Sequence, residues 1–232
     1  MSEPAGAAAP SGSRSRAAAN RRLLPRLWLL NLGLAVLLVE TNRSDRAFNL
    51  LRNWALSSPQ SAEARVELGE HKAEDYRALN PYGQIPTAEF DGQTLIESTA
   101  ICLALAERHP EARLIPQQQG QRDLFWQSVN LSVSTLEAPV VLYYLSRRGI
   151  VDAAWAEMWA GPLSPRLSVF AESVPEEGYI CDDFSLADIC TAYVLRIGVQ
   201  AGLLPFEGKL ESYLRRLMAR PAGQAARFFD GF

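Results

Sequence analysis

The first half of the chain alternates short apolar runs with amphipathic stretches. Residues 33–40 form a short apolar run that contains Val36 and Val39, which predicts a buried strand. Residues 41–56 begin with polar capping residues and continue with apolar positions at helical spacing, which predicts a helix. Residues 62–68 alternate between apolar and polar and predict a second strand. A strand, a helix and a strand in this order predict a parallel pair joined by a crossover.

A second group of elements follows in quick succession. Residues 70–79 are polar and predict a loop or a short helix. Residues 80–101, "NPYGQIPTAEFDGQTLIESTAI", predict two strands joined by an Asp-Gly turn at 91–92. A helix is predicted over 98–108. Together with the first group, these elements predict a compact α/β domain that ends near Pro116.

The second half of the chain has helical periodicity throughout. Apolar positions recur at helical spacing from Leu124 to Met218, and no strand signal of any length follows residue 116. We therefore predict an α/β domain followed by an all-α domain. The predicted boundaries are a tail over 1–32, an α/β domain over 33–116 and an all-α domain over 120–232.

The stretch "FSLAD" at 184–188 precedes a strongly apolar helical segment. Ser185 followed three residues later by Asp188 is the pattern of a capping box, in which each side chain bonds the other residue's backbone N–H. The pattern predicts the start of a buried helix. The functional alternative is an acid catalyst at Asp188.

Composition narrows the classes of function. The chain has 232 residues, of which 48% are hydrophobic and 21% are charged, as in ordinary globular proteins. The net charge of -3 provides no basic field, so nucleic acid is not an expected partner. Three scattered cysteines without a Cys-x-x-Cys motif predict neither a disulfide framework nor a metal site. We expect a reducing environment and no bound metal.

The N-terminal segment differs from the rest of the chain. Residues 1–32 carry five arginines against one acid, Glu3, and overlap an apolar run at 27–39. That run has 13 residues and is too short to span a bilayer, so no stable membrane insertion is expected. The favoured interpretation is a disordered tail before the first strand, in a cytoplasmic protein. The alternative is an address, either an organelle transit peptide or a secretory signal.

Three stretches resemble one known family. "EHKAEDYRALNPYGQIPT", "DGQTLIESTAICLALAERHPEARLIP" and "FSLADICTAYVLRIG" are similar to the cytosolic glutathione transferases. The resemblance runs from about residue 33 to 229 and is most specific between 70 and 116. It implies a thioredoxin-like domain followed by an all-helical domain, which agrees with the periodicity.

The resemblance also implies an activity. It implies a homodimeric detoxification enzyme that conjugates the thiolate of glutathione, its co-substrate, to small hydrophobic electrophiles or reduces organic peroxides. A non-catalytic binding or scaffold protein of the same fold is the alternative. The transferase class and the acceptor are left open.

The family pattern places glutathione along the segment that opens the first of the two later strands. By resemblance, Pro86 is a cis proline, which exposes the backbone of Ile85 to the cysteinyl backbone of glutathione. Glu97 and Ser98 would hold the ammonium and the carboxylate of the γ-glutamyl group. From the residues alone, a trans proline on an edge strand and an ordinary helix cap are the alternatives.

Further positions complete the predicted binding site. By resemblance, His71 and Lys72 help to hold the glycyl carboxylate, and Gln84 contributes a contact at the same end. A charged surface loop is the alternative for the first two. The all-α domain would contribute the acceptor pocket. Its candidates are Phe125, Trp126, Tyr143, Tyr144 and Trp159, each of which is otherwise a core residue.

The reaction requires a thiolate at neutral pH, whereas a free thiol has a pKa of about 8.5. A hydroxyl hydrogen bond and a helix N-terminus both favour the anion. The family places the activating residue after the first strand, where Ser44 and Thr41 are the candidates, with Ser44 favoured. Both also fit ordinary helix caps. Residues 33–65 contain no cysteine or tyrosine, which argues against the cysteine-type relatives.

Overall fold

The computed structural model describes residues 72–90, 92–225, 228–229 and 232. The tail predicted over 1–32 and the first strand, helix and second strand, predicted between residues 33 and 68, lie outside the described residues. The same holds for Asp91 of the predicted turn.

The first described elements follow the predicted order. The polar segment forms a short helix, α4 (Glu74–Leu79). A hairpin follows, with β1 (Thr87–Phe90) paired antiparallel to β2 (Gln93–Ile96). The register pairs Phe90 with Gln93, and Gly92 between the strands takes φ 80°, a value that glycine adopts without steric cost. Helix α5 (Ser98–Arg108) has the predicted bounds.

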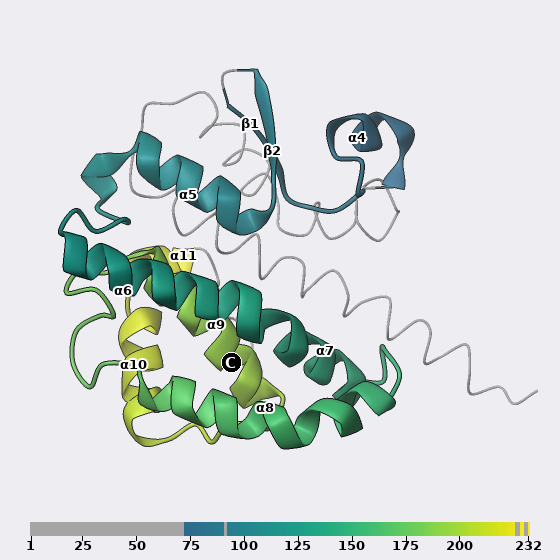
Figure 1. The fold of residues 1–232 in the computed structure, drawn as a ribbon, viewed down its shortest axis with the longest axis vertical. Coiled ribbons are helices and arrows are strands. Elements are labelled where there is room, and N and C mark those ends of the chain that lie inside the picture. The colour runs from purple at the N-terminus through teal and green to yellow at the C-terminus, as the bar shows by residue number, and fades with distance from the viewer. Residues whose placement is uncertain (1–71, 91, 226–227, 230–231) are drawn as a thin grey trace, which may run out of the picture.

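Helix α5 packs against two hydrophobic clusters. Ile101 and Leu105 contact the hairpin residues Ala88 and Phe90. Cys102, on the neighbouring face, joins the large cluster of the helical part. Figure 1 shows α5 between the hairpin and the remaining helices. Among the described elements, α5 therefore links the hairpin to the helical part.

From residue 110 onward the described elements are helical. They are η2 (Pro110–Ala112), α6 (Gln119–Asn130), η3 (Leu131–Glu137), α7 (Ala138–Arg147), α8 (Ala154–Glu172), α9 (Leu186–Gln200), α10 (Gly208–Met218) and α11 (Pro221–Ala225). The only departures among the described residues are two isolated β-bridges, Tyr179 with Asp182 and Cys181 with Asp183. The described part thus has a small antiparallel sheet followed by helices, as predicted.

Helix α9 lies at the centre of the helical part. Every residue from Leu186 to Gly198 is buried. The Ser185 side chain accepts hydrogen bonds from the backbone N–H groups of Ala187 and Asp188, and the Ser185 N–H donates to Asp188 Oδ2 at 2.9 Å. The predicted capping box is therefore confirmed. Because all oxygens of this fully buried acid serve as acceptors inside the protein, the geometry supports the structural role of Asp188.

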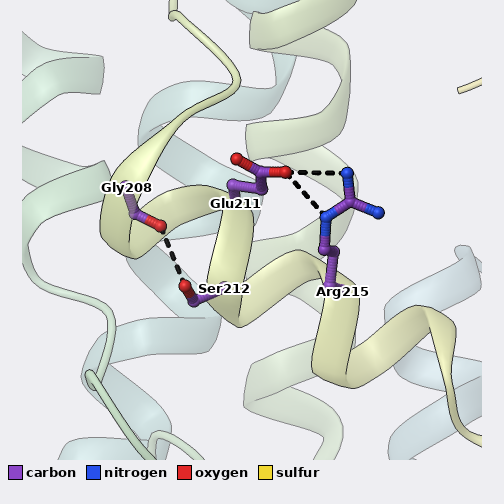
Figure 2. A network of polar contacts seen from close by, with 4 residues as sticks. All are labelled: Gly208, Glu211, Ser212 and Arg215. Atoms are coloured by element: carbon purple, nitrogen blue, oxygen red, sulfur yellow. Dashed lines mark hydrogen bonds and ion pairs between the residues drawn. The ribbon is translucent and has the colours of Figure 1, made fainter.

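Helix α10 carries an ion pair and a side-chain hydrogen bond at exposed or partly exposed positions. The guanidinium of Arg215 pairs with Glu211 at 2.7 Å, four residues earlier, and the Ser212 hydroxyl donates to the Gly208 carbonyl at 3.0 Å (Figure 2). Exposed pairs of this kind contribute about 0.3–0.5 kcal/mol. Packing of Leu210, Tyr213, Leu214 and Leu217, rather than these pairs, holds α10 in place.

The described residues contain neither a membrane-spanning helix nor a metal-binding cluster of side chains. None of their helices combines the length and the apolar character needed to cross a bilayer. Within the same residues, no three His, Cys, Asp or Glu side chains lie close enough together to hold a metal ion.

Candidate functional site

The register of the hairpin brings the two halves of the predicted site together. Thr87 opens β1 and lies opposite Ile96, which ends β2. The residues just before β1 therefore adjoin the residues just after β2, because paired positions of antiparallel strands are about 5 Å apart. Ile85 and Pro86 meet Glu97 and Ser98 at this end of the hairpin.

Glu97 occupies a special backbone position between β2 and α5. It is exposed and takes φ 70° and ψ 118°, a conformation that costs a non-glycine residue on the order of 1–3 kcal/mol. Glu97 holds the N-cap position, and its side chain makes no capping hydrogen bond. Ser98 is consequently the first helical residue and not the cap. Its partly buried side chain still lies in the first turn, beside the N–H groups of the helix start.

The segment before β1 presents its backbone rather than its side chains. Ile85 and Pro86 are buried, Gln84 is exposed, and the Ile85–Pro86 peptide bond is cis. Within the described part of the chain, no hydrogen bond involves the backbone N–H or C=O of Ile85. This arrangement suits an extended ligand that pairs with main-chain groups.

Several side chains from the preceding segment hold this backbone. The Tyr76 hydroxyl donates to the Gln84 carbonyl at 2.8 Å, and the Asn80 amide donates to the same oxygen at 2.7 Å. The Lys72 ammonium donates to the Gly83 carbonyl at 2.6 Å. Sequence reasoning did not single out Tyr76 or Asn80. The signal available in the sequence was the position of Tyr76, which lies one helical turn before an Asn-Pro turn.

The remaining predicted polar residues are placed only in part. Lys72 is exposed, and the bond to Gly83 holds its ammonium at the same end of the segment as Gln84. His71, Ser44 and Thr41 lie outside the described residues. Their roles stay predictions.

The five aromatic candidates for the acceptor pocket differ in exposure. Phe125 is fully buried and Tyr144 nearly so, both within the main hydrophobic cluster. Trp126 is 37% exposed and lies edge-on to Phe125, while Tyr143 and Trp159 are partly buried. Burial favours a core role for the first two, and the pocket assignment of all five stays a prediction.

A cavity of about 610 Å³ lies within the helical part. Its wall is formed by α6, η3, α8 and α9 and by the loop that follows α8. The lining residues are Leu124, Gln127, Ser128, Leu131, Thr135, Leu136, Pro165, Arg166, Val169, Phe170, Ser173, Pro175, Ile180 and Thr191. None of the five aromatic candidates lines this cavity.

Comparison with known proteins agrees with this geometry. The family model described as "Glutathione S-transferase, N-terminal domain" matches residues 59–108, which include the hairpin and α5. Glutathione S-transferase 3 of Zea mays is 29% identical over 168 residues, covering 67% of this chain and 76% of the maize protein. Residues 59–108 thus match a glutathione S-transferase N-terminal domain, and the chain is similar to a glutathione transferase over about two thirds of its length.

Other relatives of this chain match over shorter lengths. Probable maleylacetoacetate isomerase 2 of Drosophila melanogaster is 29% identical over 125 residues, which are 53% of this chain and 54% of that protein. Maleylacetoacetate isomerase of Dictyostelium discoideum is 31% identical over 129 residues, covering 53% and 58%. The chain thus spans about half the length of the curated isomerases that it matches.

Solved structures of a glutathione transferase and of Ure2p share the fold. Glutathione transferase F7 from Populus trichocarpa has a TM-score of 0.61 at 20% identity, covering 72% of this chain and 84% of the poplar chain. Ure2p in complex with glutathione has a TM-score of 0.62 at 17% identity, covering 85% and 88%. The predicted fold class, a thioredoxin-like domain followed by a helical domain, is confirmed.

Proposed function

We propose that this chain is a glutathione transferase that joins the glutathione thiol to small hydrophobic electrophiles or reduces organic peroxides. One observation carries the proposal: the pairing of Thr87 with Ile96 brings the Ile85 backbone and the Glu97–Ser98 pair to one end of the hairpin. A main-chain donor and acceptor then adjoin an exposed carboxylate and a helix start. Glutathione requires these features, since it carries peptide groups and a terminal ammonium and carboxylate.

The groups of the site correspond to those of the tripeptide. The Ile85 N–H and C=O would pair with the cysteinyl main chain, as in the addition of a short strand. The carboxylate of Glu97 would accept from the γ-glutamyl ammonium, and Ser98 with the N-terminus of α5 would donate to the γ-glutamyl carboxylate. Lys72, and His71 by family resemblance, would attract the glycyl carboxylate, with Gln84 at the same end.

The chemical step requires a thiolate and an electrophile. Ser44, or Thr41 in its place, would donate a hydrogen bond to the glutathione sulfur and so favour loss of its proton. The thiolate would then attack an electrophilic carbon, form the C–S bond and displace a leaving group that departs with its bonding electrons. With an organic peroxide the thiolate would attack one oxygen and break the O–O bond, and the alkoxide that leaves would take up a proton to become an alcohol. The thiol of a second glutathione would then attack the sulfur of the resulting sulfenic acid, forming the disulfide and releasing water.

The relatives favour a second candidate reaction. Several proteins that match this chain are named maleylacetoacetate isomerases. An isomerase of this kind would use the same glutathione site without consuming glutathione. Turnover of maleylacetoacetate with no loss of free thiol would identify this second candidate, whereas loss of one thiol per product identifies conjugation.

The assembly and location proposed for the chain follow the family resemblance. We propose a homodimer in the cytoplasm with glutathione and an electrophile as its small-molecule partners. Analytical ultracentrifugation of the full chain tests the assembly directly, and a single species at the monomer mass would contradict it.

The first test is a glutathione titration at neutral pH, followed by the ultraviolet absorbance of the bound thiolate. We expect a saturable thiolate signal that Ser44→Ala lowers, with Thr41→Val as the competing assignment. Glu97→Gln should raise the dissociation constant about five- to tenfold, because a charge-assisted hydrogen bond is lost. Glu89→Gln, at an exposed position of β1, is the matched control and should bind as the unmodified chain does.

The outcomes separate enzyme from scaffold. Saturable binding without a thiolate signal would favour the non-catalytic binding protein of the same fold. Absence of binding by the full chain would overturn the proposed function.

A further inference from the structure

The carbonyl oxygen of Gln84 is held by two side chains. The Tyr76 hydroxyl donates to it at 2.8 Å and the Asn80 amide nitrogen donates to it at 2.7 Å. A carbonyl oxygen has two lone pairs, so these two donors complete its hydrogen bonding. Gln84 itself is exposed, yet its carbonyl is fixed by neighbours from α4 and from the end of that helix.

Each of these two side chains is itself fixed by a second contact. The Tyr76 oxygen lies 2.8 Å from the Thr87 hydroxyl at the start of β1. Since the Tyr76 proton is used on Gln84, Thr87 is the donor in that second bond. Asn80 is buried, and its side-chain oxygen accepts from the Tyr82 N–H at 3.1 Å. Tyr76 is therefore held by a residue after Gln84, and Asn80 by a residue before it.

Fixing this carbonyl also fixes the next amide. The peptide group is planar, and in the trans Gln84–Ile85 bond the Ile85 N–H points away from the Gln84 oxygen. The N–H therefore points away from Tyr76 and Asn80. The Ile85 N–H also makes no hydrogen bond within the described residues.

We propose that Tyr76 and Asn80 are positioning residues that aim the Ile85 N–H at the main chain of glutathione. This inference rests on the proposed function, because it concerns the same site. Neither side chain needs to touch the ligand. The Tyr76 hydroxyl acts through the peptide plane, so its removal should weaken binding and leave the chemical step unchanged.

The protonation state of Tyr76 is compatible with this role over a wide pH range. Burial raises the pKa of Tyr76 above its ordinary value, and the hydrogen bond from Thr87 opposes part of that rise. The hydroxyl keeps its proton at neutral pH and can donate to Gln84 throughout the range in which the enzyme is assayed.

Tyr76→Phe is the decisive variant, because it removes the hydroxyl and keeps the ring. We expect KM and the dissociation constant for glutathione to rise about 3- to 10-fold, the range for one lost hydrogen bond, with kcat unchanged. Tyr82→Phe is the matched control: Tyr82 is 71% exposed, and the substitution should leave both constants unchanged. Thr87→Val should have a smaller effect than Tyr76→Phe, because Gln84 keeps both of its donors.

A second measurement, by NMR, reports on the Gln84–Ile85 peptide group in the absence of any ligand. Losing a donor at the Gln84 oxygen changes the polarisation of the peptide, so the ¹⁵N resonance of Ile85 in the free protein should shift in Tyr76→Phe and stay in place in Tyr82→Phe. Asn80→Asp removes the other donor and serves as the second variant if Tyr76→Phe does not fold.

The outcomes distinguish this inference from the proposed function. If the unmodified chain binds glutathione and Tyr76→Phe binds it equally well, or loses kcat rather than affinity, the positioning role is wrong. An unchanged Ile85 resonance contradicts it independently. If the unmodified chain does not bind glutathione, the proposed function fails and the binding role of Tyr76 fails with it. The resonance then reports only that the hydroxyl orients the peptide.

Discussion

The carboxylate of Asp188 is fully buried and accepts hydrogen bonds from three directions. Its Oδ2 accepts from the Ser185 N–H at 2.9 Å and from the Ser185 hydroxyl at 3.3 Å. Its Oδ1 accepts from the Ile180 N–H and the Tyr213 hydroxyl, each at 3.0 Å. One side chain thus connects the start of α9, the loop before it and α10.

Asp188→Asn should be considerably more destabilising than loss of the cap alone. An amide presents donors where a carboxylate presents acceptors, so at least one buried donor loses its partner. We expect a loss of about 3 kcal/mol in the free energy of unfolding, measured by urea denaturation. Ser185→Ala is the comparison and should cost about 1 kcal/mol, as an N-cap does. Equal losses in the two variants would show that the contacts to Ile180 and Tyr213 contribute nothing.

At this scale the sequence predicts local partners and misses distant ones. Ser185 and Asp188 are three residues apart, so their reciprocal bonds follow from the geometry of one helical turn. Tyr213 lies 25 residues further along the chain, and no local pattern predicts that its hydroxyl reaches Asp188. The bond from the Tyr76 hydroxyl to the Gln84 carbonyl was missed for the same reason, because it joins a side chain to a backbone group eight residues away.

At the scale of elements, the close packing of α9 is shown by Gly198. A Cβ placed there would lie 3.2 Å from Leu204 Cδ1 and 3.5 Å from Leu167 Cδ1, and both leucines are buried. Gly198→Ala should therefore lose about 1 kcal/mol of stability, since overpacking outweighs the gain in helix propensity.

Gly120→Ala is the matched control for this prediction. Gly120 is exposed in the first turn of α6, and a Cβ there would meet nothing within 4 Å. This variant should gain about 0.5 kcal/mol from helix propensity alone. Chemical denaturation of both variants measures whether the free energy of unfolding falls or rises. A rise in Gly198→Ala would mean that the leucines move aside at little cost.

The elements themselves were predictable where the signals were strong and local. The Asp-Gly turn and the change from alternating to helical spacing predicted the hairpin and the bounds of α5. Spacing could not distinguish core from pocket among the aromatic residues, because a buried ring and a pocket-facing ring share the same helical periodicity. Phe125, fully buried, and Trp126, 37% exposed, are neighbours with the same sequence signal.

At the scale of the whole molecule, the burial of its thiols makes the free energy of unfolding depend on pH in the alkaline range. All three cysteines are buried, with Cys102 on α5 and Cys190 on α9 in the main cluster that joins the hairpin side to the helical part. Burial raises the pKa of Cys181 to about 11, although a hydrogen bond with Ser185 opposes the shift. Burial also raises the pKa values of Cys102 and Cys190 above their ordinary values.

The sign of the pH effect on stability depends on whether the folded or the unfolded state keeps its thiol protons to higher pH. An unfolded cysteine thiol ionises at a lower pH than the buried thiols of the folded protein, which stay protonated to higher pH. Above pH 9 the unfolded state therefore releases protons first and is favoured, so the free energy of unfolding falls as pH rises toward 11. For Cys181 the loss at pH 10 should be about 1 kcal/mol relative to pH 7.

Cys181→Ala tests this linkage when its stability is followed from pH 7 to pH 10.5 under a reducing agent. The variant loses some packing at every pH, so the informative quantity is the slope and not the offset. We expect the difference in unfolding free energy between the unmodified chain and the variant to shrink by about 1 kcal/mol between pH 7 and pH 10. Only the unmodified chain has this thiol, whose ionisation favours the unfolded state. A constant difference across that range would mean that Cys181 titrates alike in both states. The thiol would then be accessible to solvent in the folded protein, contrary to its exposure of only 2%.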